Sequence, residues 1–218
     1  MVSVQAPGDS PLAETSHMVA MARAAAAGGA AGIRAEGPDV GAIREAVGLP
    51  LIGLRKRRVA GSDVYITPEL EDARAVGDAD IVAVDASLRP RPGGEDGPSF
   101  VAALARELAL PVLADVDSYD AGVAARAAGA AAVATTLSGY TDADPPPSGP
   151  DIELVRRLAE ALDCPVLAEG RYASPGDVRA AFAAGAHAVV VGAAITDPLA
   201  LTRRFAAAVP GKADGTPR

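Results

Sequence analysis

Polar side chains follow short apolar runs at several places in this sequence, and several of them can titrate. Lys56 comes after an apolar run that begins near Pro50, and Glu169 ends the run Val-Leu-Ala-Glu. If these runs are parallel strands, their carboxyl ends meet at one face of the fold, where the reactive groups of such folds gather. The same placement is shared by Gln5, Arg34, Asp85, Asp115, Thr135, Thr136 and Gly192. The set as a whole predicts a catalytic site.

Each of these residues, taken alone, can also be explained by a structural role without catalysis. Lys56 lies in the basic run 55–58, which is equally typical of a solvated cluster or a nucleic-acid patch. Glu169 is as easily explained by a pairing with Arg171 or with a backbone amide. For Asp85 and Asp115, at equivalent strand ends, orientation of a loop is the favoured role. The catalytic prediction therefore depends on the group and not on one member.

The two histidines are poorly placed to bind a metal ion. His17 falls in the first expected helix, and His187 comes just before the last expected strand, at the end opposite the predicted site. Carboxylates alone rarely hold a first-row transition metal. We therefore predict no catalytic metal and a structural role for His187.

Glycine-containing loops follow the last two expected strands. They are Gly170-Arg171 and Gly192-Ala193-Ala194. Backbone amides in such loops can point at an anion, and barrels of parallel strands commonly bind phosphate at this place. An ordinary turn is the alternative, because glycine also serves wherever a turn needs unusual backbone angles. Two such loops on adjacent strands favour a phosphate site.

Two interleaved patterns mark where the strands begin. One is a glycine with an apolar residue four places on, and the other is a proline that opens an apolar run, which strands tolerate at their first position. Together they predict strands near 1–5, 32–35, 50–55, 80–85, 112–115, 131–136, 165–169 and 188–192. The first of these is expected to be short, because Pro7 follows closely.

Segments with helical spacing separate these runs, so the chain reads as eight strand–helix units. The runs are apolar without strict alternation, which is typical of parallel strands covered on both faces. We predict an α/β protein with a single (β/α)8 TIM barrel over residues 1–209 and a disordered tail over 210–218. An open doubly wound sheet is the alternative fold, but no glycine-rich dinucleotide motif follows the first strand.

Composition restricts the class of partner and the compartment. The chain has 218 residues, half of them hydrophobic, and a net charge of −8, which disfavours nucleic acid as a partner. Cys164 is the only cysteine, as is common in a reducing compartment, and no long uncharged apolar stretch predicts a membrane span. We therefore expect a cytoplasmic protein that binds neither nucleic acid nor membranes.

Several motifs, in order and nearly from end to end, resemble those of the N-acetylmannosamine-6-phosphate 2-epimerases. They are Ser-Val-Gln-Ala from Ser3, Gly-Ile-Arg-Ala from Gly32, Val-Tyr-Ile-Thr-Pro from Val64, Thr-Thr-Leu-Ser-Gly-Tyr-Thr from Thr135, Ala-Glu-Gly-Arg from Ala168 and Gly-Ala-His-Ala-Val-Val-Val-Gly from Gly185. The set is far more specific than any one motif.

The resemblance implies a role for each residue of the predicted site. It makes Lys56 and Glu169 the acid and base of a cofactor-independent C2 epimerisation, assisted by Arg34. It places the sugar against Gln5, Asp115, Thr136 and Arg171, and the 6-phosphate at Gly170, Arg171, Gly192 and Ala193. It implies a phosphorylated amino sugar as substrate, a place in sialic acid catabolism, and a homodimer as a candidate assembly.

Three departures from that family pattern bear on specificity. Val4 stands where the family usually has Cys, and Ala193 stands where it has Ser, which removes a hydroxyl near the phosphate. The segment 57–59 is Arg-Arg-Val in place of Arg-Asp-Tyr, so we expect basic surroundings for Lys56, which would lower its pKa and suit it to act as a base. We expect this chain to retain the catalytic activity of the family and to bind phosphate more weakly.

Two other functions fit the same residues. Lysines at strand ends also form Schiff bases, so an aldolase-type barrel that uses Lys56 as its nucleophile is one alternative. A non-catalytic sugar-phosphate sensor is the other, suggested by Ala193 and the short first strand. Intact Lys56 and Glu169 make the sensor the weaker alternative.

Overall fold

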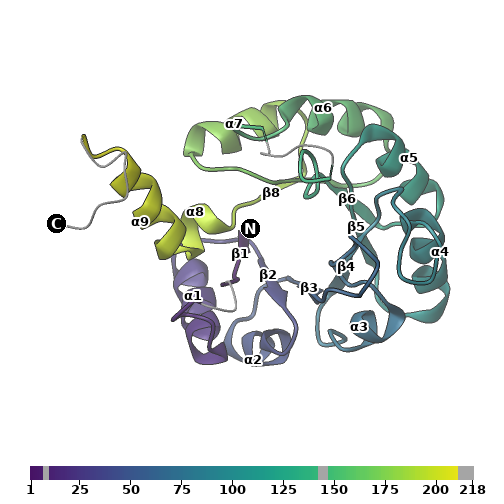
Figure 1. Ribbon diagram of the computed structural model, residues 1–218, viewed down its shortest axis with the longest axis horizontal. Helices are drawn as coiled ribbons and strands as arrows, with labels where there is room; N and C mark the ends of the chain where they lie inside the picture. Colours follow the sequence, from purple (N-terminus) through teal and green to yellow (C-terminus); the bar gives the residue numbers. More distant parts are fainter. Residues whose placement is uncertain (7–9, 142–146, 211–218) are drawn as a thin grey trace.

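Eight parallel strands run around a ring in the computed structural model of this chain, which describes residues 1–6, 10–141 and 147–210 (Figure 1). The strands are β1 (Val2–Ser3), β2 (Ile33–Glu36), β3 (Leu51–Leu54), β4 (Ile81–Asp85), β5 (Val112–Asp115), β6 (Ala132–Ala134), β7 (Val166–Glu169) and β8 (Ala188–Val190). Each pairs with the next, and Val2 bridges to Val191 beyond β8. The ring is therefore closed, which confirms the (β/α)8 barrel over the open sheet.

The predicted strand positions are confirmed to within two residues at nearly every end. The first strand is as short as expected, with two residues in its ladder, and backbone bonds from Ser3 to Val191 and from Val4 to Arg34 extend its pairing. Asp85 and Asp115 are register partners at the ends of β4 and β5. The carboxyl ends of the strands thus meet at one mouth, as the site prediction requires.

Nine helices are described, and most lie outside the ring. They are α1 (Thr15–Ala27), α2 (Asp39–Ala46), α3 (Leu70–Arg74), α4 (Gly97–Glu107), α5 (Tyr119–Ala127), α6 (Ile152–Ala161), α7 (Pro175–Ala183), α8 (Ala193–Thr196) and α9 (Pro198–Ala207). Ser118, Asp151 and Ser174 each cap a helix by accepting a bond from a backbone N–H three residues on. Every helix within the described residues is too short or too polar to cross a bilayer.

The core has three clusters because both faces of the strands are covered, and the smallest of them lies between β7, β8, α6 and α7. One cluster fills the inside of the barrel with Ile52, Leu54, Leu113, Leu167 and small side chains. Another lies between the strands and helices α1 to α6. Small residues permit close contact there: a side chain at Gly122 of α5 would place its Cβ 2.5 Å from Leu158 of α6.

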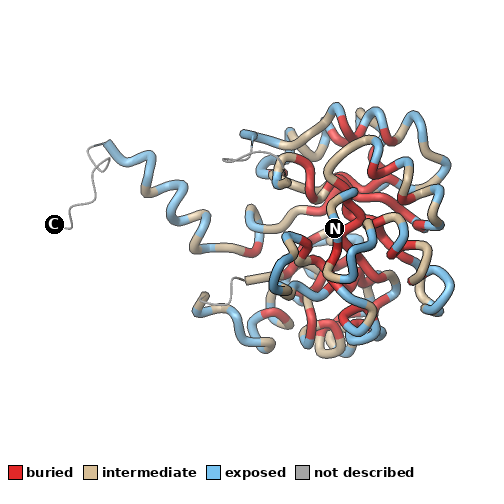
Figure 2. The backbone as a smooth tube through the Cα atoms, turned by 45° about the vertical axis from the view of Figure 1, so that its right-hand side comes forward, coloured by how far each residue is buried: buried red, intermediate tan, exposed pale blue. Residues whose placement is uncertain are grey.

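Helix α9 differs from the other long helices because it projects away from the barrel (Figures 1 and 2). Asp197 caps its first turn, but none of its residues is buried. Phe205 is 74 % exposed. The predicted barrel domain, 1–209, thus includes a helix that does not pack in the ring. Except for the exposed Pro210, the predicted tail lies outside the described residues.

Candidate active site

A cavity of about 360 Å³ opens at the carboxyl ends of the strands. This volume suits a small metabolite. The residues around it include Gln5, Arg34, Lys56, Tyr65, Thr136, Tyr140, Glu169, Gly170, Arg171, Gly192, Ala193, Ala194 and Arg204. The cavity therefore brings together residues that follow or end β1, β2, β3, β6, β7 and β8.

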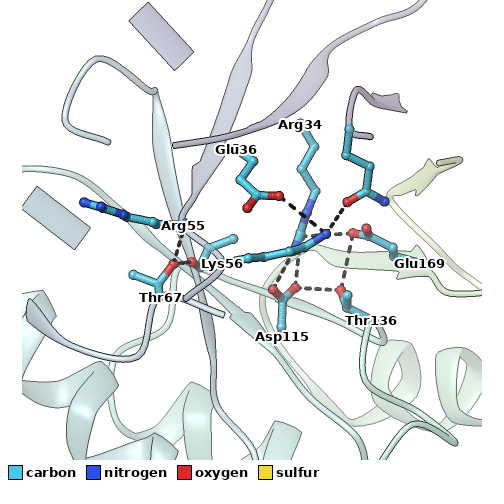
Figure 3. A network of polar contacts seen from close by, with 10 residues as sticks. Arg34, Glu36, Arg55, Lys56, Thr67, Asp115, Thr136 and Glu169 are labelled. Atoms are coloured by element: carbon cyan, nitrogen blue, oxygen red, sulfur yellow. Dashed lines mark hydrogen bonds and ion pairs between the residues drawn. The ribbon is translucent and has the colours of Figure 1, made fainter. Parts of the chain in front are cut away.

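Arg34 lies at the base of this cavity and is 2 % exposed. Its Nη1 and Nη2 donate to Asp115 Oδ1 and Oδ2 at 3.0 and 2.6 Å, and Nη1 also lies 3.0 Å from Glu169 Oε2 (Figure 3). Burial alone would lower the pKa of Arg34, but the two carboxylates outweigh it and raise that pKa. The guanidinium is thus a fixed positive charge that holds Glu169 in place.

Glu169 ends β7 and is largely buried. Thr136 Oγ1 lies 2.6 Å from Asp115 Oδ1 and 3.3 Å from Glu169 Oε2. Burial raises the pKa of Glu169 to about 7, with a further increase from the Asp115 carboxylate, and Arg34, Lys56 and Thr136 offset only part of the rise. A carboxyl group with this pKa exchanges a proton readily near neutral pH.

Lys56 reaches the same cavity from the segment after β3. Its Nζ donates a short hydrogen bond to Gln5 Oε1 and lies 3.6 Å from Glu36 Oε2 (Figure 3). The Lys56 side chain thus has a carbonyl oxygen and a carboxylate as its neighbours. The site therefore brings Lys56 into the same cavity as a carboxyl group whose pKa lies near neutrality.

Comparison with known proteins identifies the family of this chain. Residues 18–211 match the family model described as "Putative N-acetylmannosamine-6-phosphate epimerase". The chain belongs to this family. Proteins named "Putative N-acetylmannosamine-6-phosphate 2-epimerase" are 44 % identical in Caldanaerobacter subterraneus subsp. tengcongensis (94 % of this chain, 88 % of that protein) and 41 % identical in Clostridioides difficile (96 % and 95 %).

Solved structures support the same assignment. The N-acetylmannosamine-6-phosphate 2-epimerase from Clostridium perfringens superposes with a TM-score of 0.90 at 38 % identity, covering 95 % of this chain and 92 % of that one. The thiamine phosphate pyrophosphorylase from Pyrococcus furiosus has a TM-score of 0.60 at 19 % identity over 89 % of this chain and 85 % of its own. The second likeness shows the barrel fold alone, so the first carries the family assignment.

Glu36 lies within ion-pair distance of Lys56 in this epimerase-family chain, and the strand-end pattern missed it. Strand β2 continues two residues beyond Arg34, the expected strand end, to Glu36. Side chains two apart on a strand point to the same face, so Glu36 is directed toward the mouth above Arg34. The polar residues two positions apart, Arg34 and Glu36, were the signal in the sequence that could have identified Glu36.

The surroundings of Lys56 are less basic than the run of arginines suggests, because Arg57 is engaged by acidic partners. Arg57 donates to Asp72 Oδ1 and Oδ2 at 2.9 and 2.7 Å, and also bonds to Glu69. Arg58 lies over the Tyr65 ring, 5.5 Å from its centroid. The partners of Arg57 lie in α3 or at its N-cap, whereas Tyr65, under Arg58, lines the cavity. Among the described residues, Glu36 is the acidic group within ion-pair distance of Lys56.

Asp85 and Asp115 are completely buried, and neither lines the cavity. Asp85 accepts from Ser87 N and Oγ and pairs with Arg89 at 2.8 Å, so it orients the loop after β4. Asp115 lies behind Arg34, with both oxygens occupied. Its position suits the support of Arg34 better than direct contact with a sugar.

The two expected phosphate loops both border the cavity, but Arg171 does not extend freely into it. Its Nε donates to the Gly149 carbonyl at 2.6 Å, and its Nη1 bonds to the Ser138 carbonyl. Gly170 and Arg171 have φ values of +107° and +61°, which produce the tight turn after β7. Part of the preceding loop, residues 142–146, lies outside the described residues.

Proposed function

We propose that this chain interconverts N-acetylmannosamine 6-phosphate and N-acetylglucosamine 6-phosphate by removing and returning the proton at C2. The observation that carries the proposal is the meeting of Glu169 and Lys56 in one cavity, above the Arg34–Asp115 pair. The family assignment supplies the substrate class. We also propose that the reaction needs no cofactor and serves sialic acid catabolism in the cytoplasm.

The two titratable groups have complementary roles in this scheme. Arg34 and Thr136 both contact Oε2 of Glu169, which leaves Oε1 to take the C2 proton. Loss of that proton places negative charge on the neighbouring carbonyl oxygen, and Lys56 can stabilise this charge or return a proton to the opposite face. A carboxylate base and an ammonium acid on different strands can therefore serve the two faces of C2.

The direct test follows N-acetylmannosamine 6-phosphate with this protein in deuterated water by proton NMR. We expect N-acetylglucosamine 6-phosphate to form with loss of the C2 proton signal, and Lys56→Ala to abolish both. The chain has only one other lysine, so Lys212→Ala is a matched control that should turn over normally.

Two outcomes would contradict this scheme. Turnover without deuterium at C2 would exclude a C2 proton transfer. A covalent adduct on Lys56 after borohydride treatment with substrate would support the aldolase alternative.

We also propose a homodimer, with α9 as the pairing surface. A helix of ten residues is marginal in water without tertiary packing, yet α9 buries none of its side chains. Phe205 and Val209, along it and just after it, are 74 % and 48 % exposed. A two-fold pair would let each α9 pack on the other copy, and such self-complementary pairing is the commonest assembly of like chains.

Light scattering coupled to size exclusion tests this pairing. We expect twice the chain mass of 21.7 kDa for the wild type and a shift to the single-chain mass for Phe205→Ser. Leu88→Ser is the control, because Leu88 is 51 % exposed on the loop after β4, away from α9. A wild type that stays monomeric at high micromolar concentration, or a Phe205→Ser variant that stays dimeric, would refute the assembly.

A further inference from the structure

Four cationic side chains line the cavity, and three of them already have partners. Arg34 is paired with Asp115 and Glu169, Lys56 contacts Gln5 and Glu36, and Arg171 donates to two backbone carbonyls. The fourth is Arg204 of α9. Within the described residues, its guanidinium forms no ion pair or hydrogen bond.

Arg204 reaches the cavity because of its position on α9. Ala200, Leu201 and Arg204 all line the cavity, and they share one side of the helix because residues three and four apart are neighbours on a helix surface. The adjacent Arg203 does not line it. On the barrel side, this part of the cavity is bordered by Gly192, Ala193 and Ala194, the loop after β8 that we expected to hold phosphate.

Asp177, in the first turn of α7, is an acidic residue whose pKa the charge of Arg204 lowers slightly. Asp177 Oδ2 accepts from the backbone amides of Ala173 and Ser174 at 3.0 and 2.9 Å. These bonds and the one from Ser174 are the main causes that lower the pKa of Asp177, and the charge of Arg204 contributes least. Asp177 is therefore engaged in capping α7, and the guanidinium of Arg204 stays available.

We propose that Arg204 binds the 6-phosphate of the substrate, in the role that the sequence assigned to Arg171. The inference rests on the proposed function, since it concerns the same substrate. C2 and the phosphate lie at opposite ends of the open sugar chain, so the phosphate cation belongs on a different part of the cavity from Lys56 and Glu169. A guanidinium presents paired donors that match the oxygens of a phosphate dianion.

The test compares Arg204→Gln with Arg203→Gln, a neighbouring arginine on the same exposed helix. We expect Arg204→Gln to raise KM for N-acetylmannosamine 6-phosphate on the order of 10- to 100-fold, the usual effect of losing hydrogen bonds to a charged group, with kcat changed less than about threefold. Arg203→Gln should keep both constants, and Arg204→Lys should recover part of the affinity because it restores the charge.

Inorganic phosphate provides a readout that does not depend on turnover. It should raise the melting temperature of the wild type and of Arg203→Gln, and raise that of Arg204→Gln much less, because binding to the folded state stabilises it. Arg203→Gln and Arg204→Gln each remove one cation from α9, so their melting temperatures without phosphate should agree, and a difference that appears only with phosphate reports the anion site.

The two proposals fail in different ways. If the wild type epimerises the sugar but Arg204→Gln keeps its KM and its response to phosphate, Arg204 does not bind the phosphate. If the wild type forms no epimer while phosphate still stabilises it through Arg204, the proposed reaction is wrong and the anion site stands.

Discussion

Replacing Glu169 with Gln should lower kcat on the order of 10²- to 10⁴-fold, the usual contribution of a positioned base, while the barrel stays folded. Gln keeps the shape of the side chain and its contact with Thr136 but cannot accept the C2 proton. The measurement is the initial rate of epimer formation by proton NMR, with circular dichroism to confirm the fold. Glu160→Gln is the control, because Glu160 pairs with the exposed Arg156 on α6, away from the cavity lining.

The pH dependence of kcat/KM for the wild-type enzyme should follow the titration of Glu169. Because the pKa of Glu169 is raised to about 7, kcat/KM should rise with pH up to about 7 and then level off, as the carboxylate form becomes dominant. Exchange of C2 deuterium in the reverse direction should follow the same profile. A flat profile between pH 5 and 8, or a Glu169→Gln variant within tenfold of wild type, would remove Glu169 from the role of base.

Stability should respond to pH in the opposite sense. A carboxyl group whose pKa is higher in the folded than in the unfolded chain contributes stability at low pH, and that contribution is lost as the pH rises through the folded value, here about 7. The side chain at position 169 of the Glu169→Gln variant does not titrate, so this variant does not lose stability as the pH rises through about 7. At pH 8 we therefore expect the inactive variant to be no less stable than the wild type.

Removal of Arg34 should give the largest loss of stability among the site residues. Arg34→Leu leaves the fully buried Asp115 carboxylate without its bidentate partner, and breaking a buried pair in this way costs about 3–5 kcal/mol. The measurement is the free energy of unfolding in urea. Arg156→Leu removes two exposed ion pairs of α6 instead, with Glu153 and Glu160, and should cost no more than about 1 kcal/mol.

The double variant Arg34→Leu/Asp115→Leu tests whether the loss of stability in Arg34→Leu comes from the unpaired Asp115 carboxylate. Because it removes both charges together, it should recover much of the stability lost by Arg34→Leu, although neither variant should be active. Equal stability of Arg34→Leu and the wild type would show that the pair does not hold the interior of the barrel together.

The strands were largely predictable because local chemistry marks their starts. Pro50, Pro111 and Pro165 each immediately precede a strand, and the turns at Gly29, Gly129 and Gly185 have positive φ. These signals depend on the backbone conformations that single proline and glycine residues allow. They can therefore be recognised in the sequence before the fold is known. Closure of the ring was a weaker inference, because it depends on the contact of Val2 with Val191, at the two ends of the sheet.

The partners of the charged side chains were not predictable in the same way. The sequence shows four basic residues together at 55–58, but only the three-dimensional arrangement places Asp72 against Arg57 and Glu36 against Lys56. Likewise, nothing in the spacing of α9 distinguishes a helix that packs in the ring from one that projects. Charge pairing and helix placement depend on distances between distant segments, whereas strand starts depend on neighbours.

The Arg34–Asp115–Glu169 network also divides unequally between the two halves of the barrel. Strand β2 supplies the buried cation, and strands β5 and β7 supply both carboxylates. A fragment ending after β4 would expose an unmatched guanidinium, and the complementary fragment two unmatched carboxylates. Pairing of the buried charges and assembly of the site thus require both halves of the barrel to come together.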